Sequence, residues 1–250
     1  MVSPVPGSRT HFTIGGKLMN TAILTIDDIA SKNTPAIVDY LKEKNIKAIL
    51  FAVGENVERY YEEAVYAVKS GMIVGNHSYS HKAFSTLTLE EAIKDIEKCE
   101  AVLDKLYQDC GVERVYRPFR FPFGDKGGAN KDALQAYFKE KGFHKVDDNH
   151  LPYPWWSEFG LKKDIDTFWT FDFAEYMIRP GSDFTKESVW EKMHDKNPQN
   201  GAVLFEEGNR HFLLLHAHDE TEEMVPQYYK LCIDHLLENG ITFDEPKFLM

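Results

Sequence analysis

Short apolar runs alternate with amphipathic stretches along the chain from Thr21 onward. A short apolar run between polar residues is typical of a buried strand, and apolar residues every three or four positions are typical of a helix. The pattern predicts strands at residues 22–26, 48–53, 72–75, 143–146, 167–171 and 211–215, and another that starts at Val115. It predicts helices at residues 34–44, 57–71, 88–107, 130–142 and 221–239.

Residues that favour helix ends support several of these assignments. Thr34 followed by Pro35 is typical of an N-cap and the first helical position. Thr88 with Glu91 three positions later predicts a capping box. Gly71 ends the second predicted helix, a position where glycine is common. The helices therefore have predictable limits as well as apolar faces.

Strands and helices that alternate in this way predict parallel strands joined by right-handed crossovers. We therefore expect a closed or nearly closed α/β barrel, and a length of 250 residues suits one such domain. Residues 1–20 are interpreted as a flexible N-terminal leader and residues 21–250 as the barrel domain. The connections at 147–164 and 196–209 are unusually long, and long loops are often functional.

The composition narrows the choice of partners. With 29 Lys and Arg against 40 Asp and Glu, the net charge is −11, which argues against a nucleic acid partner. Hydrophobic residues make up 43% of the chain and aromatic residues 13%, enough for a sizeable core. No apolar run approaches the roughly 20 residues of a membrane-spanning helix, so we expect no membrane span. The three cysteines lack metal-binding spacing and are interpreted as packed thiols.

The first 20 residues have neither the basic nor the apolar region of a signal peptide. We expect a soluble cytoplasmic protein, or an extracellular or periplasmic one if this chain derives from a longer precursor. The sequence leaves the oligomeric state open.

Side chains suited to chemistry follow five of the predicted strands. In a parallel barrel the carboxyl ends of the strands share one face, where active sites are built. We therefore expect these side chains to lie together. They are Asp27 and Asp28, His77 and His81, Arg120, Asp172 and Glu175, and His216.

This set of side chains suits metal-assisted hydrolysis. One Asp and two His are common ligands of a divalent ion such as Zn²⁺, and three protein ligands leave positions open for water and substrate. A second, adjacent Asp is placed to remove a proton from water. A further His on the opposite wall is placed to protonate a leaving group.

The ordered motifs resemble those of the polysaccharide deacetylases, also called NodB-homology proteins or carbohydrate esterase family 4. The resemblance covers residues 22–243 and implies a single distorted (β/α) barrel with outer helices. Thr25-Ile26-Asp27-Asp28 is similar to the first motif, His77-Ser78-Tyr79-Ser80-His81 to the second and Arg120-Phe121-Pro122-Phe123-Gly124 to the third. Asp172-Phe173-Ala174-Glu175-Tyr176 resembles a weakened fourth motif, and Leu214-Leu215-His216 matches the fifth.

The resemblance implies a role for each matching residue. Asp27 is the general base, and Asp28, His77 and His81 are the ligands of a divalent metal ion. We expect Zn²⁺, with Co²⁺, Mn²⁺ or Ni²⁺ as alternatives that the same ligands accept. The remaining roles are orientation of Asp27 by Arg120, stabilisation of the oxyanion by the backbone N–H of Phe123, and general acid catalysis by His216 tuned by Glu175.

Two residues depart from the family pattern, Glu175 in place of Asp and Tyr176 in place of Trp. Neither change removes a ligand or the base, so we expect an active hydrolase with altered substrate preference. The leading hypothesis is a deacetylase of an N-acetylated glycan such as chitin oligosaccharides or peptidoglycan. The alternatives are an O-acetyl xylan esterase, a cyclic-amide hydrolase, or a catalytically weak carbohydrate-binding protein.

Several other residues have two interpretations. Trp155 and Trp156 lie in the first long connection, either as a hydrophobic clamp that closes the barrel or as a substrate-binding platform that stacks on sugar rings. Tyr176 is a candidate for contact with substrate. His218 is interpreted as a solvent-facing loop residue with a secondary option of assisting the site, and Arg117 as a salt-bridge residue.

Overall fold

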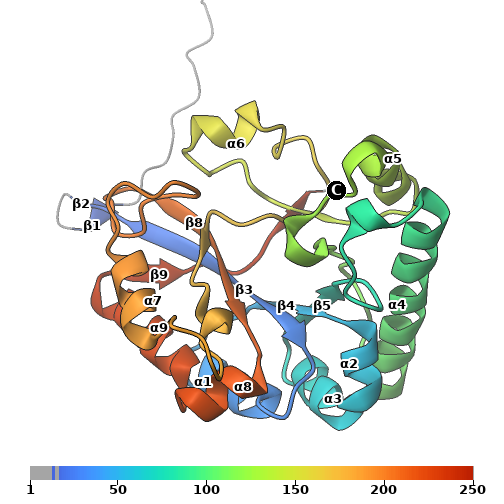
Figure 1. The fold of residues 1–250 in the computed structure, drawn as a ribbon, viewed down its shortest axis with the longest axis horizontal. Coiled ribbons are helices and arrows are strands. Elements are labelled where there is room, and N and C mark those ends of the chain that lie inside the picture. Colours follow the sequence, from blue (N-terminus) through green and yellow to red (C-terminus); the bar gives the residue numbers. More distant parts are fainter. Residues whose placement is uncertain (1–12, 15–16, 250) are drawn as a thin grey trace, which may run out of the picture.

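Six parallel strands lie at the centre of the computed structural model, which describes residues 13–14 and 17–249 (Figure 1). Their order is β5-β4-β3-β8-β7, and β9 pairs with the first residues of β3. The strands are β3 (Asn20–Ile29), β4 (Ile49–Ala52), β5 (Ile73–Asn76), β7 (Phe171–Asp172), β8 (Arg210–His216) and β9 (Ile241–Phe243). Two short antiparallel pairs lie apart from this sheet, β1 (Thr13–Ile14) with β2 (Lys17–Leu18) and β6 (Lys145–Val146) with β10 (Phe248–Leu249).

Two segments without regular strand structure close the sheet into a barrel. Asn76 at the end of β5 donates its backbone N–H to Pro118 O at 2.9 Å and accepts one from Arg120 N at 3.0 Å. The same segment reaches the chain before β7, because Thr167 N donates to Phe119 O at 2.7 Å. That chain joins β8, next to β3. The expected distorted (β/α) barrel is therefore confirmed.

The helices surround the strands (Figure 1). Figure 1 places α1, α2, α3 and α4 around one side of the sheet and α7 and α9 around another. Within the described part of the chain, no helix is both long and apolar enough to cross a membrane. The helices are α1 (Thr34–Glu43), α2 (Gly54–Arg59), α3 (Tyr61–Lys69), α4 (Leu89–Cys110), α5 (Lys131–Glu140), α6 (Pro154–Glu158), α7 (Lys186–Met193), α8 (Asp219–Met224) and α9 (Tyr228–Glu238).

Alternate residues of each strand face the helices and the barrel interior. Ile26 and Leu50 belong to the large core between sheet and helices, and both are buried. Cys99 of α4 lies in the same core, in agreement with its interpretation as a packed thiol. The capping box of Thr88 and Glu91 is present at the start of α4. Local signals therefore predicted this helix and its buried face correctly.

The structure corrects two predicted helices. The stretch predicted as a helix at 57–71 begins earlier and is divided between α2 and α3 at Tyr60. The stretch predicted at 221–239 is divided between α8 and α9. Pro226 lacks the N–H that a continuous helix needs, and Gln227 adopts a left-handed backbone conformation with φ of 61°. Pro226 therefore interrupts the helix, although the apolar periodicity continues across the break.

The strand predictions were correct for β3, β4, β5 and β8 and less accurate for the other predicted strands. The prediction of a strand that starts at Val115 is wrong, because this segment forms only one isolated β-bridge, between Asn76 and Phe119. Of the strand predicted at 143–146, only Lys145–Val146 forms one, and it pairs with β10 outside the central sheet. Helices α6 and α7 were not predicted. Residues 1–12 and 15–16 of the predicted leader lie outside the described residues.

The side chain of Trp156 closes the barrel at the amino ends of its strands. Trp156 is 3% exposed and packs in one cluster with Ile49, Ile73 and Phe212, which lie in the first half of β4, β5 and β8. Its indole N–H donates to Asp148 Oδ2 at 2.7 Å. Figure 1 shows α6 beyond the start of β8, away from the arrowheads of β3 and β8.

This position makes Trp156 a structural residue. Trp156→Ala should lower the free energy of unfolding by about 3–5 kcal/mol, because a large buried ring is replaced by a cavity. Phe159→Ala is the matched control, since that neighbouring ring is 71% exposed, and its effect should stay within about 0.5 kcal/mol. Urea unfolding followed by fluorescence measures both, and equal stability of the two variants would contradict the packing role.

Candidate active site

The register of the sheet brings the predicted residues to one end of the barrel. Asp27 near the end of β3 is the register partner of His216 at the end of β8. His77 follows β5, and its backbone N–H donates to Ala52 O of β4 at 3.0 Å. Side chains from three strands therefore meet at the carboxyl ends, as the sequence predicted.

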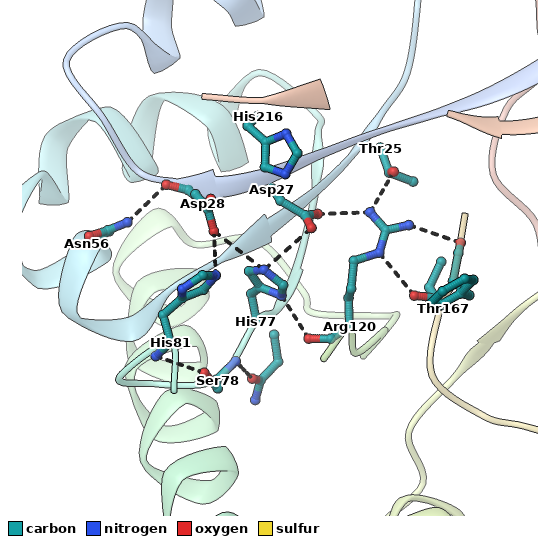
Figure 2. Close-up of polar contacts among 12 residues, drawn as sticks. Thr25, Asp27, Asp28, Asn56, His77, Ser78, His81, Arg120, Thr167 and His216 are labelled. Atoms are coloured by element: carbon teal, nitrogen blue, oxygen red, sulfur yellow. Dashed lines mark hydrogen bonds and ion pairs between the residues drawn. The ribbon is translucent and has the colours of Figure 1, made fainter. Parts of the chain in front are cut away.

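Arg120 is fully buried beside Asp27 (Figure 2). Its Nη1 donates to Asp27 Oδ1 at 2.8 Å and to Thr25 Oγ1 at 2.7 Å. Its Nε and Nη2 donate to the carbonyl oxygens of Thr167 at 3.0 Å and Phe168 at 3.1 Å. The guanidinium also lies over the ring of Phe51, 4.5 Å from its centroid. These contacts fix both Arg120 and the oxygen of Asp27 that it binds.

Asp28, His77 and His81 form a compact group on one side of Asp27 (Figure 2). Their candidate ligand atoms all lie within 4.8 Å of one another. Asp28 Oδ1 is 3.0 Å from His81 Nε2 and 3.4 Å from His77 Nε2. It is buried and makes no hydrogen bond of good geometry within the described residues. A buried carboxylate oxygen that faces two imidazole nitrogens is suited to a cation that all three residues contact.

The protonation of His77 fits this role. Its Nδ1 lies 2.8 Å from the carbonyl oxygen of Arg120, so Nδ1 carries the proton and Nε2 presents a lone pair. Burial lowers the pKa of His77, which keeps the ring neutral. The pKa of Asp28 lies well below its usual range: burial acts to raise it, but the neighbouring imidazoles of His218, His81 and His77 outweigh that effect. A neutral imidazole and an ionised carboxylate are the forms that bind Zn²⁺.

The loop that carries His77 and His81 is held by side chains from neighbouring elements. Ser78 N donates to the Asn76 side chain at 2.8 Å, and His81 N donates to Ser78 Oγ at 3.1 Å. Asp95 of α4 accepts hydrogen bonds from the backbone N–H groups of Tyr79 and Ser80. These bonds fix the loop between the two histidines.

Four residues around the group have left-handed backbones although none is glycine. The φ angles are 66° for Asp28, 65° for Ser78, 53° for His81 and 59° for Phe123. Residues with a β-carbon rarely adopt this conformation, and it often marks functional sites.

His216, the register partner of Asp27, is held by Glu175. Glu175 is 1% exposed, and its Oε1 accepts the backbone N–H of His216 and lies 3.3 Å from the ring Nδ1. Burial opposes the charge on His216, but Glu175, with smaller contributions from Asp28 and Asp172, raises the pKa of His216 to about 10. The Tyr228 hydroxyl donates to the carbonyl oxygen of His216. The longer arm of Glu175 thus reaches the histidine.

Asp172 adjoins this pair. Its Oδ1 accepts the backbone N–H of Ala174 at 2.8 Å, and burial raises the pKa of Asp172 to about 6. Asp172, Glu175 and His216 form a second group of close ligand-type atoms. Through its bond to Ala174, Asp172 holds the loop that follows β7.

Two aromatic rings flank the site. Phe123 is 68% exposed, and its ring packs edge-on against His81 with centroids 4.6 Å apart. Tyr176 is 37% exposed and packs in the same manner against His216, also at 4.6 Å. The site therefore opens between one exposed ring beside the Asp28 group and another beside His216.

Trp155 and Trp156 do not belong to this site. Trp156 is buried at the opposite end of the barrel, and Trp155 is half-buried and stacks on Tyr153, with ring centroids 5.4 Å apart. The Tyr153 hydroxyl donates to Arg210 O at the start of β8. At 3% exposure Trp156 has no free face for a sugar ring, so its interpretation as a substrate-binding residue is wrong. The packing of Trp155 on Tyr153 agrees with the hydrophobic clamp.

His218 is a residue of the site whose contact was not predicted from the sequence. Its Nε2 lies 2.6 Å from Asp28 Oδ2. The available signal was its spacing, because it follows His216 by two positions, and alternate residues at a strand end share a side. Arg117 contacts Glu100, Nη2 to Oε2 at 2.7 Å, and is the salt-bridge residue predicted.

Sequence comparison supports the resemblance carried by the motifs. A profile described as polysaccharide deacetylase matches residues 16–145, just over half of the chain. The chain belongs to this family. The match ends before β7 and β8, so it does not include Glu175 or His216.

This chain is similar to individual proteins whose names describe glycan deacetylases. It is 37% identical over 84 residues to a peptidoglycan-N-acetylglucosamine deacetylase of Bacillus cereus, covering 33% of this chain and 30% of the relative. It is 34% identical over 132 residues to chitin deacetylase 1 of Cryptococcus neoformans, covering 48% of this chain and 27% of the relative. The matched part thus spans less than a third of each relative's length.

Solved structures share the fold at lower identity. Peptidoglycan deacetylase PdaC from Bacillus subtilis has a TM-score of 0.57 at 21% identity, covering 90% of this chain and 87% of that one. A protein of Bacillus anthracis described as a CE4 family pseudoenzyme has a TM-score of 0.54 at 20% identity, covering 89% and 62%. Because active and inactive proteins share the fold, the fold alone does not decide activity.

The pair of His216 and Glu175 yields a direct prediction. Replacing Glu175 by Gln should return the pKa of His216 from about 10 toward its ordinary value of 6.5, because the negative charge beside the ring is removed. Since folding raises this pKa, the pair stabilises the fold fully below about pH 6.5 and loses that effect as the pH rises through about 10. NMR titration of the metal-free protein measures the pKa, with Glu158→Gln as an exposed control. An unchanged His216 titration in Glu175→Gln would refute the pairing.

Proposed function

We propose that this chain is a metal-dependent hydrolase that removes acetyl groups from an N-acetylated glycan of the chitin or peptidoglycan type. The observation that carries the proposal is the arrangement around Asp27. A ligand group with a neutral histidine and a further histidine that favours its charged form both lie next to Asp27. Amide hydrolysis needs both a polarising centre and a proton donor.

The proposed ligands are Asp28, His77 and His81, and the buried, unbonded Oδ1 of Asp28 supports this assignment. We expect Zn²⁺, with Co²⁺, Mn²⁺ or Ni²⁺ as alternatives. When bound, the ion supplies a Lewis acid that polarises the acetyl carbonyl and makes water more acidic.

Asp27 acts as general base in this proposal. Arg120 binds its Oδ1 at 2.8 Å, while its Oδ2 lies on the side of the ligand group, 3.4 Å from His77 Nε2. The free oxygen is thereby directed to the place where water attacks. Three further hydrogen bonds of Arg120, to Thr25, Thr167 and Phe168, fix this orientation.

His216 acts as general acid, and Phe123 contributes its backbone N–H to stabilise the tetrahedral oxyanion. Because Glu175 raises the pKa of His216, the ring holds a proton at neutral pH that it can pass to the departing amine. An amine leaves poorly without a proton, so this donor matters more for an amide than for an ester.

The exposed rings of Phe123 and Tyr176 are proposed to contact the sugar on either side of the acetyl group. A net charge of −11 favours a neutral substrate over an anionic polymer and tolerates the cationic amino sugar that deacetylation forms. O-acetylated xylan and cyclic amides are the alternative substrates, and binding without turnover is the alternative function.

The experiment that tests this function measures the release of acetate from N-acetylated chitin oligosaccharides and from acetylxylan, each with and without a chelator. The proposal predicts release from the chitin oligosaccharides that a chelator abolishes and Zn²⁺ restores. Release from acetylxylan alone would select the esterase. Release from neither substrate by metal-loaded protein would overturn deacetylation of both, leaving hydrolysis of a cyclic amide and glycan binding to be assayed separately.

Asp27→Asn tests the base. We expect a loss of at least about 100-fold in kcat with metal content unchanged, because Asn keeps an oxygen for Arg120 but cannot take a proton. Asp132→Asn on α5 is an exposed control and should retain full activity. Measurement of bound metal and of kcat on the same samples separates the outcomes. Loss of metal in Asp27→Asn would show that Asp27 is a ligand.

A further inference from the structure

The second oxygen of Asp28 has a partner that none of the proposed catalytic roles uses. His218 Nε2 lies 2.6 Å from Asp28 Oδ2, whereas His77 and His81 face Oδ1. The two oxygens of one carboxylate therefore have different surroundings. Oδ1 is buried without a hydrogen bond, and Oδ2 is bound.

The fold fixes His218 opposite Asp28. Ala217 N donates to Asp27 O at 3.0 Å, which extends the pairing of β8 with β3 past His216. His218 directly precedes α8, whose first residue, Asp219, accepts hydrogen bonds from the backbone N–H groups of Lys32 and Asn33 at 3.3 and 3.1 Å. The loops after β3 and β8 are thus joined on both sides of the contact.

Asp28 is held from its backbone as well. The Asn56 side chain donates to the carbonyl oxygen of Asp28 at 3.0 Å (Figure 2). The residue has a left-handed backbone, so the direction of its carboxylate depends on such contacts. Asn56 fixes the main chain, and His218 fixes the far oxygen.

We propose that His218 is a positioning residue for metal binding, which donates Nε2–H to Asp28 Oδ2 and leaves Oδ1 as the oxygen presented to the ion. The inference rests on the ligand set of the proposed function. An imidazole nitrogen 2.6 Å from a carboxylate oxygen shares a proton with it, because two lone pairs at that distance repel. That nitrogen therefore has no lone pair to offer an ion.

The positions of the other ligand atoms support a donor rather than a fourth ligand. Among the described residues, the set whose ligand atoms lie within 4.8 Å of one another comprises Asp28, His77 and His81, without His218. Hydrogen bonds to the ligands of a metal typically change its affinity by 10–100-fold. The ring of His218 is 34% exposed, so a substitution there leaves the core intact.

The test compares metal binding of wild type, His218→Ala, His218→Gln and His150→Ala, all prepared without metal. Zn²⁺ affinity is measured by competition with a chromophoric chelator, and Co²⁺ binding by visible absorption. We expect His218→Ala to bind Zn²⁺ about 10–100-fold more weakly. His218→Gln, which retains an N–H donor at similar reach, should recover most of the affinity. His150 is exposed and far from the site in sequence, and His150→Ala should match wild type.

The outcomes separate this inference from the function on which it rests. Equal Zn²⁺ affinity of His218→Ala and wild type would overturn the positioning role. Failure of His218→Gln to recover affinity, with a Co²⁺ spectrum that differs from wild type, would overturn it in favour of His218 as a ligand. If wild type binds neither ion, the metal site of the proposed function is refuted together with the inference.

Discussion

The ion pair of Arg120 and Asp27 inside the barrel is the interaction on which the rest of the site depends. A fully buried guanidinium is costly unless its N–H groups are bonded, and here β3 and the chain before β7 bond it. The backbone of Arg120 also bonds to Asn76 and to the ring of His77. One residue thus closes the barrel, orients the proposed base and sets the tautomer of a proposed ligand. Loss of the Arg120 side chain would leave Asp27 as an unpaired buried charge.

The two sides of the site differ because their neighbours differ. At His77 burial lowers the pKa more than the nearby Asp27 and Asp28 raise it, whereas at His216 the carboxylate of Glu175 outweighs burial. Burial lowers the pKa in both cases, and only the adjacent negative charges at His216 reverse it. Histidine is therefore the proposed metal ligand at one position, His77, and the proposed general acid at another, His216, at the same end of the barrel. Glu175, a departure from the family motif, still reaches His216, which is consistent with a retained acid.

Local patterns predicted what depends on local physics. The strand that ends in Asp27 and the capping box of Thr88 follow from periodicity and helix-end chemistry, and both are present. The end of the barrel at which Trp156 packs was not predictable, because a long connection can cover either end and its apolar content is the same in both cases. The contact of His218 with Asp28 depends on how two loops from distant strands meet. Such contacts are set by tertiary packing, which spacing along the chain does not record.

The left-handed residues around the site have a consequence for engineering this protein. Asp28, Ser78, His81 and Phe123 each carry a β-carbon in a conformation that costs roughly 1–2 kcal/mol. Together this is comparable with the net stability of a typical domain, about 5–15 kcal/mol. A screen that rewards heat resistance alone will therefore enrich glycine at these positions and erase two of the proposed ligands, Asp28 and His81, together with the exposed ring of Phe123. Thermostable forms that keep their chemistry have to be sought in the helices and in the loops far from β3.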